Sequence, residues 1–124
     1  MNVALWIVQA VLALVFLGAG TVKLTQTREQ LIARLGDWVN DYPAGQIKAI
    51  GTAEVLGAVG LIAPPALHIL PVLAPLAAAG LVVVMIGASV VHARRGEHSK
   101  VAVNLALAAL ALFVAWGRFG PDKF

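Results

Sequence analysis

Four long, mostly apolar stretches constrain this chain more than any other feature. They cover residues 3–22, 47–63, 69–92 and 101–117 of a chain of 124 residues. A helix needs about 20 apolar residues to cross a hydrocarbon core of about 30 Å. The runs are continuous rather than alternating, which argues against membrane-spanning strands. The sequence therefore predicts an all-α membrane protein, a four-transmembrane-helix bundle that forms a single domain over residues 1–124.

Composition agrees with a membrane protein and excludes several kinds of site. Hydrophobic residues make up 60% of the chain and charged residues 12%, so a soluble domain of this size would expose large apolar patches. The absence of cysteine excludes disulfides, thiol redox relays and thiolate-bound iron–sulfur clusters. The three histidines match no metal-ligand spacing, so we expect no metal site.

The basic residues predict an orientation in the membrane. The connection after the first span and the connection after the third hold Lys23, Arg28, Arg34, Lys48, Arg94, Arg95 and Lys100, whereas the opposite side has only Arg118 and Lys123. The positive-inside rule places the first group in the cytoplasm and both termini outside. Because these cations are spread between spans, they act as topology signals, and we expect no nucleic-acid binding in spite of the net charge of +3.

Proline and capping residues mark the ends of the predicted helices. Pro64 and Pro65 should end or kink the second span, because proline lacks the backbone donor. Pro71 and Pro75 fall in the opening turns of the third span, where proline is better tolerated. Residues 28–41 read as one amphipathic helix on the membrane surface, opened by a capping box at Thr27. This segment is either a surface connector or a lid over an opening between the spans.

Glu54 is the residue that most needs an explanation. A carboxylate within hydrocarbon normally faces the bundle interior and finds a partner. Lys48 lies six residues earlier, on the wrong face of the helix. Lys23 is the better partner, because it closes the first span at the same depth and follows Gly18 and Gly20, which allow another helix to approach.

The other polar residues of the spans gather near the same membrane face. They are Thr21, Thr52, Ser89, His92 and Asn104, and together with Lys23 and Glu54 they form one predicted polar cluster. The cluster either holds the helices in register, or it binds the head group of a lipophilic ligand or moves a proton. The ligand-binding residues would then be Glu54, Lys23, Thr52, Ser89, His92 and Asn104, with Trp38 contributed by the lid.

Three segments resemble the DoxX-like membrane proteins. They run from Gly18 to Leu24, from Ala53 to Pro64, and from Ala88 to His92, which precedes the basic pair Arg94 and Arg95. The resemblance covers nearly the whole chain and implies a four-helix bundle in a bacterial plasma membrane. It implies association with a membrane oxidoreductase, with quinone as a possible cofactor, and it makes Lys23 and Glu54 the recurring polar positions.

Three functional hypotheses follow. The first is an accessory subunit of a redox or respiratory complex, in contact with the lipid bilayer, a membrane oxidoreductase partner or a second copy of itself, and holding a quinone or similar lipophilic small molecule. The second is a membrane-embedded isomerase or hydrolase with Glu54 as general acid or base and Lys23 beside it as the second catalytic residue. The third is a transporter or channel, which four short helices with few polar residues favour least.

Overall fold

The computed structural model describes residues 1–124, and its regular elements are all helices. Four helices are long and apolar enough to cross a membrane. They are α1 (Asn2–Thr25), α3 (Ala44–Ala66), α4 (Leu73–Arg94) and α5 (His98–Phe119). Two short helices, α2 (Arg28–Leu35) and the 3-10 helix η1 (Asp37–Asp41), lie between α1 and α3. The predicted all-α, four-helix bundle is confirmed.

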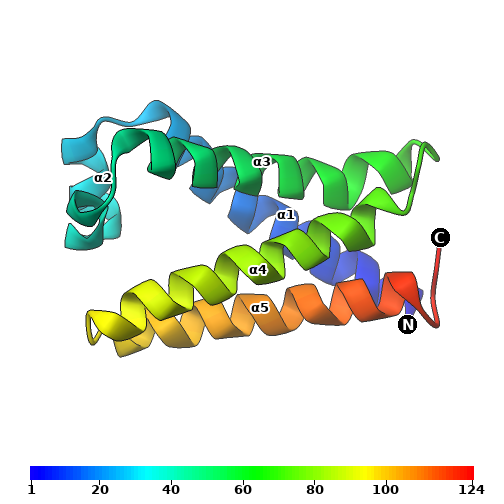
Figure 1. Cartoon of the computed structure of the whole chain (residues 1–124). Helices are drawn as coiled ribbons and strands as arrows, with labels where there is room; N and C mark the ends of the chain where they lie inside the picture. The colour runs from blue at the N-terminus through cyan, green and yellow to red at the C-terminus, as the bar shows by residue number, and fades with distance from the viewer.

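The long helices alternate in direction, so both chain termini lie at one end of the bundle (Figure 1). We term this the terminal end. The opposite end, termed the basic end, carries α2, η1 and the α4–α5 connection, and it holds seven of the nine Lys and Arg residues. Helix α1 packs on α3, α3 on α4, and α4 on α5.

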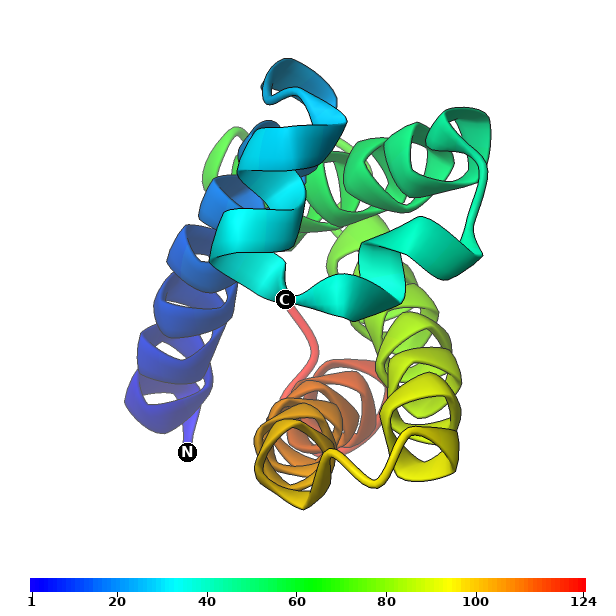
Figure 2. The ribbon, with the colours of Figure 1, turned by 90° about the vertical axis from the view of Figure 1, so that its left-hand side faces the viewer.

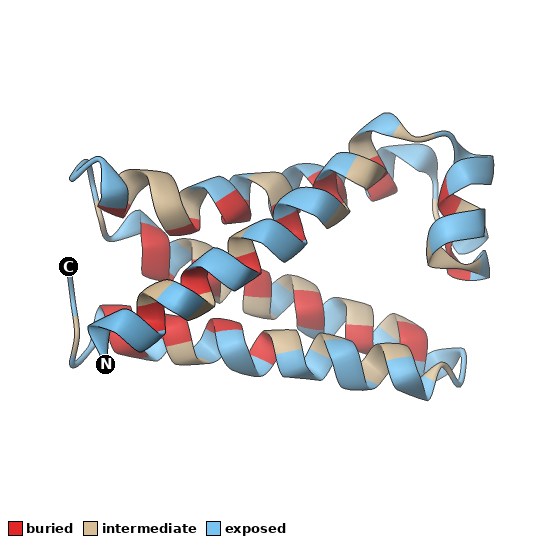
Figure 3. Cartoon of the chain, turned by 180° about the vertical axis from the view of Figure 1, so that it is seen from behind, coloured by how far each residue is buried: buried red, intermediate tan, exposed pale blue.

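The interior of the bundle is apolar and built from both large and small side chains. Buried residues form stripes along the facing sides of the long helices, whereas most of the outer surface is exposed (Figure 3). The core includes Leu5, Leu12, Phe16, Ala58, Leu61, Ala78, Leu81, Ala111 and Val114. Many exposed side chains are also large and apolar, among them Ile7, Leu14, Leu56 and Leu112. Such an outer surface suits contact with lipid acyl chains rather than with water.

Helices α1 and α5 are close at the terminal end and separate toward the basic end. At Gly117 of α5, an added Cβ would meet the Leu5 side chain of α1 at 2.7 Å. All buried residues of α5 lie from Ala108 onward, in its terminal half. The basic half of α5 is therefore not packed against a full set of neighbours, and this leaves space inside the basic half of the bundle.

The segment predicted as one surface helix over residues 28–41 is two helices, so that prediction was wrong. Thr27 and Gln30 do form the predicted capping box of α2. Helix α2 then ends at Leu35, and Gly36 adopts φ 111° before η1 begins. This backbone conformation is open to glycine because it has no side chain. A Cβ at Gly36 would also lie 2.5 Å from the Lys100 ammonium.

Pro64 and Pro65 lie in the last turn of α3, which ends at Ala66, close to the end that the sequence predicts. Pro65 has no N–H to donate to the carbonyl of Leu61, one turn earlier. That carbonyl instead accepts a hydrogen bond of 2.6 Å from the side-chain amide of Gln9 on α1. A donor from a neighbouring helix thus replaces the missing backbone bond, as happens in membrane bundles.

The third span begins later than predicted. Residues 69–72 lie outside α4, which starts at Leu73. The chain turns sharply before it, with positive φ angles at His68 and Leu70. Pro71 therefore precedes the helix, whereas Pro75 lies in the first turn, where a missing backbone donor removes no helical hydrogen bond.

Candidate functional site

Lys23 and Glu54 form an ion pair inside the basic half of the bundle. The Lys23 ammonium donates to Glu54 Oε1 at 2.7 Å, and the Glu54 side chain is 2% exposed. The partner that the sequence predicted for Glu54 is confirmed. Lys48 is on the exposed side of α3, as its spacing from Glu54 indicated.

Two glycines bring the helices of this pair together. A Cβ at Gly20 of α1 would lie 2.6 Å from the carbonyl oxygen of Gly51 on α3, and one at Gly51 would lie 2.9 Å from the carbonyl oxygen of Gly20. Gly20 therefore has the predicted role in close packing. Gly18 does not, since nothing lies within 4 Å of a Cβ placed there.

A cavity of about 660 Å³ adjoins the pair. Its walls are largely apolar and come from α1, α4 and the basic half of α5, including Val15, Phe16, Ala19, Val84, Met85 and Leu107. Polar side chains line it as well, among them Lys23, Glu54, His92, Lys100 and Asn104. Val83 and Val103 also line it and are 70% and 59% exposed, so the cavity opens toward the surroundings of the bundle. Its size is typical of sites for small organic ligands.

Helices α2 and η1 cover the cavity at the basic end. Seen from that end, they lie across the middle of the bundle (Figure 2). Leu35, Trp38 and Tyr42 from this segment line the cavity. The Trp38 ring stands edge-on to the His92 ring of α4, with 5.7 Å between centroids. Of the two interpretations of this segment, the geometry favours the lid.

Polar contacts hold the lid to the other helices. Lys100 on α5 donates to the carbonyl of Leu35 at 2.7 Å, and Arg95 after α4 donates to Asp41 of η1 at 2.6 Å. Within the segment itself, Arg28 donates to the carbonyls of Val39 and Tyr42. The lid is thus attached to both helices that flank the α4–α5 connection.

Glu97, in the α4–α5 connection, organises the cations that hold the lid. Its carboxylate bonds to His92 Nδ1 at 3.0 Å, to Lys100 Nζ at 3.1 Å and to Arg95 Nε at 3.2 Å. Two hydrogen bonds lower the pKa of Glu97 from 4.5 to about 2. The one with His92 has the larger effect and the one with Lys100 the next largest. The carboxylate is therefore charged at neutral pH and fixes Arg95 and Lys100 in place.

The structure brings most, but not all, of the predicted site residues together. Lys23, Glu54, Trp38, His92 and Asn104 line the cavity. Thr52 and Ser89 do not line it. Thr52 is exposed and donates to the carbonyl of Lys48 at 2.8 Å, and Ser89 is buried and donates to the carbonyl of Met85 at 2.8 Å.

Thr21 lies outside the cluster too, exposed on the outer side of α1. Conversely, the cavity walls include Arg34, Tyr42, Ser99 and Lys100, which the sequence reasoning did not place in the cluster. No group of three or more His, Asp or Glu side chains is placed to hold a metal ion.

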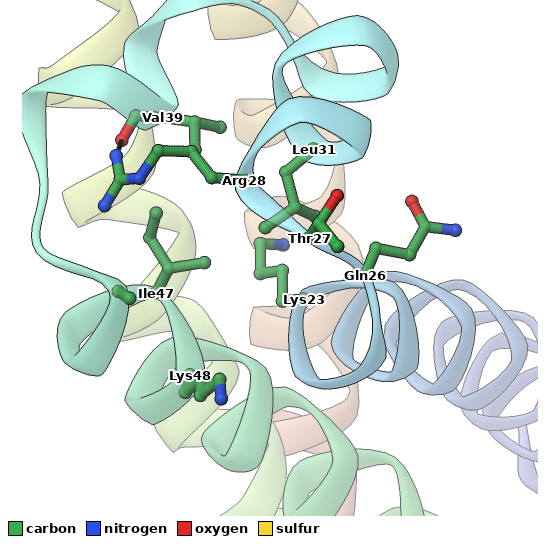
Figure 4. Close-up of a pocket in the computed structure, with 9 residues that line it drawn as sticks. Lys23, Gln26, Thr27, Arg28, Leu31, Val39, Ile47 and Lys48 are labelled. Carbon is green, nitrogen blue, oxygen red and sulfur yellow. Dashed lines mark hydrogen bonds between the residues drawn. The ribbon is translucent and has the colours of Figure 1, made fainter.

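A smaller cavity of about 190 Å³ lies beside the lid, between the ends of α1, α2 and α3 (Figure 4). Its walls include Lys23, Arg28, Leu31, Ile47 and Lys48. Lys23 lines both cavities. The ion pair therefore stands between a pocket at the basic surface and the apolar cavity within the bundle.

A second polar cluster, at the terminal end, was missed by the sequence reasoning. Arg118 of α5 is buried and donates to Gln9 at 2.8 Å and to Asn2 at 2.9 Å, both on α1. Its guanidinium carbon lies 3.9 Å from the centroid of the Phe124 ring. Gln9, an isolated polar residue in an apolar run, was the signal that could have revealed this cluster. The cluster closes the end of the bundle opposite the cavity.

Comparison with protein families gives one match, which covers most of the chain. A model of the DoxX-like family matches residues 7–114. The chain belongs to the DoxX-like family. Comparison with curated proteins and with solved structures found no match. Family membership and four membrane-crossing helices make this DoxX-like protein a small multi-pass integral membrane protein.

Proposed function

We propose that this DoxX-like protein is an accessory subunit of a membrane redox or respiratory complex that holds a quinone or another lipophilic small molecule in the cavity beneath its lid. One observation carries the proposal: the Lys23–Glu54 pair lies at the wall of a largely apolar cavity of about 660 Å³. Ligand sites commonly combine apolar walls with a few placed polar groups. The redox partner and the quinone come from the family resemblance.

The shape of the cavity supports entry of a ligand from the membrane. Exposed Val83 and Val103 lie at its open side, at the level of the spanning helices, whereas the lid covers the basic end. A lipophilic molecule can enter at this open side while its apolar part stays among the lipid acyl chains. Its polar head then meets Lys23 and Glu54 under the lid.

We further propose that the protein resides in a bacterial plasma membrane with its basic end in the cytoplasm and both termini outside. The excess of Lys and Arg at the basic end supports this orientation. Labelling of single cysteines introduced at Asn2 and at Arg94 with a membrane-impermeant thiol reagent tests it. Labelling of the Arg94 position in intact cells would contradict the orientation.

Native mass spectrometry of the protein released gently from its own membranes tests the main proposal. We expect wild type to carry a lipophilic small molecule and an oxidoreductase partner. Glu54→Gln should lose the small molecule, and Glu29→Gln, the same change on the exposed face of α2, should keep it. Retention by both variants, or no bound molecule in wild type, would contradict ligand binding. A protein found alone or only with copies of itself would contradict the accessory role.

Loss of the ligand has to be separated from loss of the fold, because Glu54→Gln leaves Lys23 without its partner. Asn104→Ala provides the second variant, since Asn104 lines the cavity and takes no part in the ion pair. We expect this variant to melt like wild type, as followed by circular dichroism, and to bind the small molecule less tightly.

A membrane-embedded isomerase or hydrolase is the second candidate function. The observation that favours it is that Glu54, a carboxyl group in contact with a lysine, lines a cavity able to hold an apolar substrate. Such a group can act as general acid or base once a substrate is placed beside it. Unchanged turnover of the retained molecule by Glu54→Gln would reject this function.

A further inference from the structure

The side chains around the larger cavity carry more positive than negative charge. Three cations line it, namely Lys23, Arg34 and Lys100, and Glu54 is the one carboxylate. Lys23 and Glu54 neutralise each other across 2.7 Å. The remaining excess comes from Arg34 on the lid and Lys100 on α5, which both belong to the basic end of the cavity.

Arg34 is the cation without a counter-ion. Arg34 lies in the last turn of α2 and is exposed. Its guanidinium lines the cavity and forms no hydrogen bond or ion pair with another part of the chain. Lys100 differs, because it donates to the Leu35 carbonyl and to Glu97. The charge of Glu97 is shared among Lys100, Arg95 and His92. Neither cation of the lid region is therefore fully neutralised from within the protein.

Uncharged donors accompany these cations. Tyr42 of the lid segment and Ser99 and Asn104 of α5 line the cavity, and their polar side-chain groups have no partner in the protein. Hydroxyl and amide groups can donate to a ligand, and a guanidinium can donate two parallel hydrogen bonds to a carboxylate or phosphate. The basic end of the cavity thus offers donors and positive charge, while its one carboxylate is already occupied.

Building on the proposed function, we infer that the ligand of this cavity is an amphiphile with an acidic head group, a carboxylate or a phosphate, which binds Arg34 beneath the lid. Its apolar chain occupies the space lined by Val15, Phe16, Val84 and Leu107 and leaves through the open side at Val83 and Val103. Arg34 is a cation with no counter-ion in the protein, so its guanidinium is available to pair with an anionic head group. A neutral head group would leave that attraction unused.

Binding of defined amphiphiles to the purified protein in dodecylmaltoside micelles, followed by isothermal titration calorimetry, tests the inference. The probes are palmitate and 1-hexadecanol, which share a chain and differ in head charge, with 1-palmitoyl lysophosphatidate and decylubiquinone as further arms. We expect wild type to bind palmitate or lysophosphatidate at least about tenfold more tightly than hexadecanol, the size of one charge-assisted hydrogen-bond pair. Whichever acid binds more tightly identifies the source as a fatty acid or a phospholipid.

Arg34→Gln and Arg94→Gln are the matched variants, since Arg94 is an exposed cation of the same end that does not line the cavity. Arg34→Gln should weaken binding of the acids about tenfold and leave hexadecanol unchanged. Arg94→Gln should change neither. Equal affinity for palmitate and hexadecanol, or equal effects of the two variants, would overturn the inference.

The same experiment separates failure of the inference from failure of the proposed function. If decylubiquinone or hexadecanol binds and the acids do not, the acidic head group is wrong and the lipophilic site stands. If none of the four probes binds to wild type, both are wrong.

Discussion

At the scale of single residues, the Lys23–Glu54 pair explains how a carboxylate is tolerated inside a membrane bundle. The two side chains are buried in contact, so neither charge is left alone. Removal of one partner leaves an uncompensated buried charge, whereas removal of both leaves a neutral site. The pair thus has a stabilising role in addition to the proposed binding role.

This predicts a strongly non-additive double-mutant cycle. Lys23→Met and Glu54→Gln should each lower the free energy of unfolding by about 3 to 5 kcal/mol, and the double variant should lose much less than the sum. Unfolding in mixed micelles with increasing denaturing detergent measures all four proteins. Additive losses would show that the two side chains do not depend on each other.

The chemistry of single residues also explains which contacts could be predicted from the sequence and which could not. Lys23 and Glu54 could be paired because charged residues in hydrocarbon must find partners. Thr52 was misplaced because the depth of a residue along a helix does not determine which face of the helix it lies on. It lies two residues, about 200°, from Glu54 and so faces the opposite side. Arg118 and Gln9 are separated by 109 positions, a contact that no local pattern can reveal.

At the scale of elements, α1 and α3 are brought together by glycines at one crossing. Gly20→Ala should lower the free energy of unfolding by about 1 to 3 kcal/mol, because the added methyl group would collide with the Gly51 carbonyl. Gly18→Ala, two residues away on the open face of α1, should be neutral or stabilising by up to about 1 kcal/mol. Thermal unfolding of both variants in detergent measures the difference. Equal effects would mean that the close approach at Gly20 is not required.

The lid, α2 with η1, depends on cations that Glu97 holds in position, and this predicts a dependence on pH. Because the pKa of Glu97 is lowered to about 2, its stabilising contribution is complete above the ordinary value of 4.5 and is lost as the pH falls from 4.5 toward 2. The free energy of unfolding should therefore fall more steeply over this window in wild type than in Glu97→Gln. Glu29→Gln, with its exposed carboxylate, should follow wild type. Parallel curves for wild type and Glu97→Gln would contradict the role of Glu97.

Element boundaries show the same division between what local sequence determines and what it does not. Thr27 and Gln30 mark the start of α2 because a capping box satisfies donors within a few residues. Pro64 and Pro65 likewise mark the end of α3 to within a few residues, but the contact that accommodates them could not be predicted from local sequence. These prolines are tolerated because Gln9, on another helix, donates to the freed carbonyl of Leu61.

At the scale of the whole molecule, the bundle is closed at one end and hollow at the other. Arg118, Gln9 and the contact of Leu5 with Gly117 close the terminal end. Toward the basic end, α1 and α5 separate, and the lid covers the space between them. The number and length of the spans could be predicted from hydropathy. The cavity could not, because it results from how four helices diverge.

Filling the cavity is the most direct test of the claim that it holds a ligand. Gly87 and Gly80 of α4 both have open space at the position of a Cβ, but only Gly87 lines the cavity. We expect native mass spectrometry to find the small molecule retained by Gly80→Phe and lost from Gly87→Phe, with both variants folded. Equal retention by the two variants would show that the ligand, if one is present, binds elsewhere.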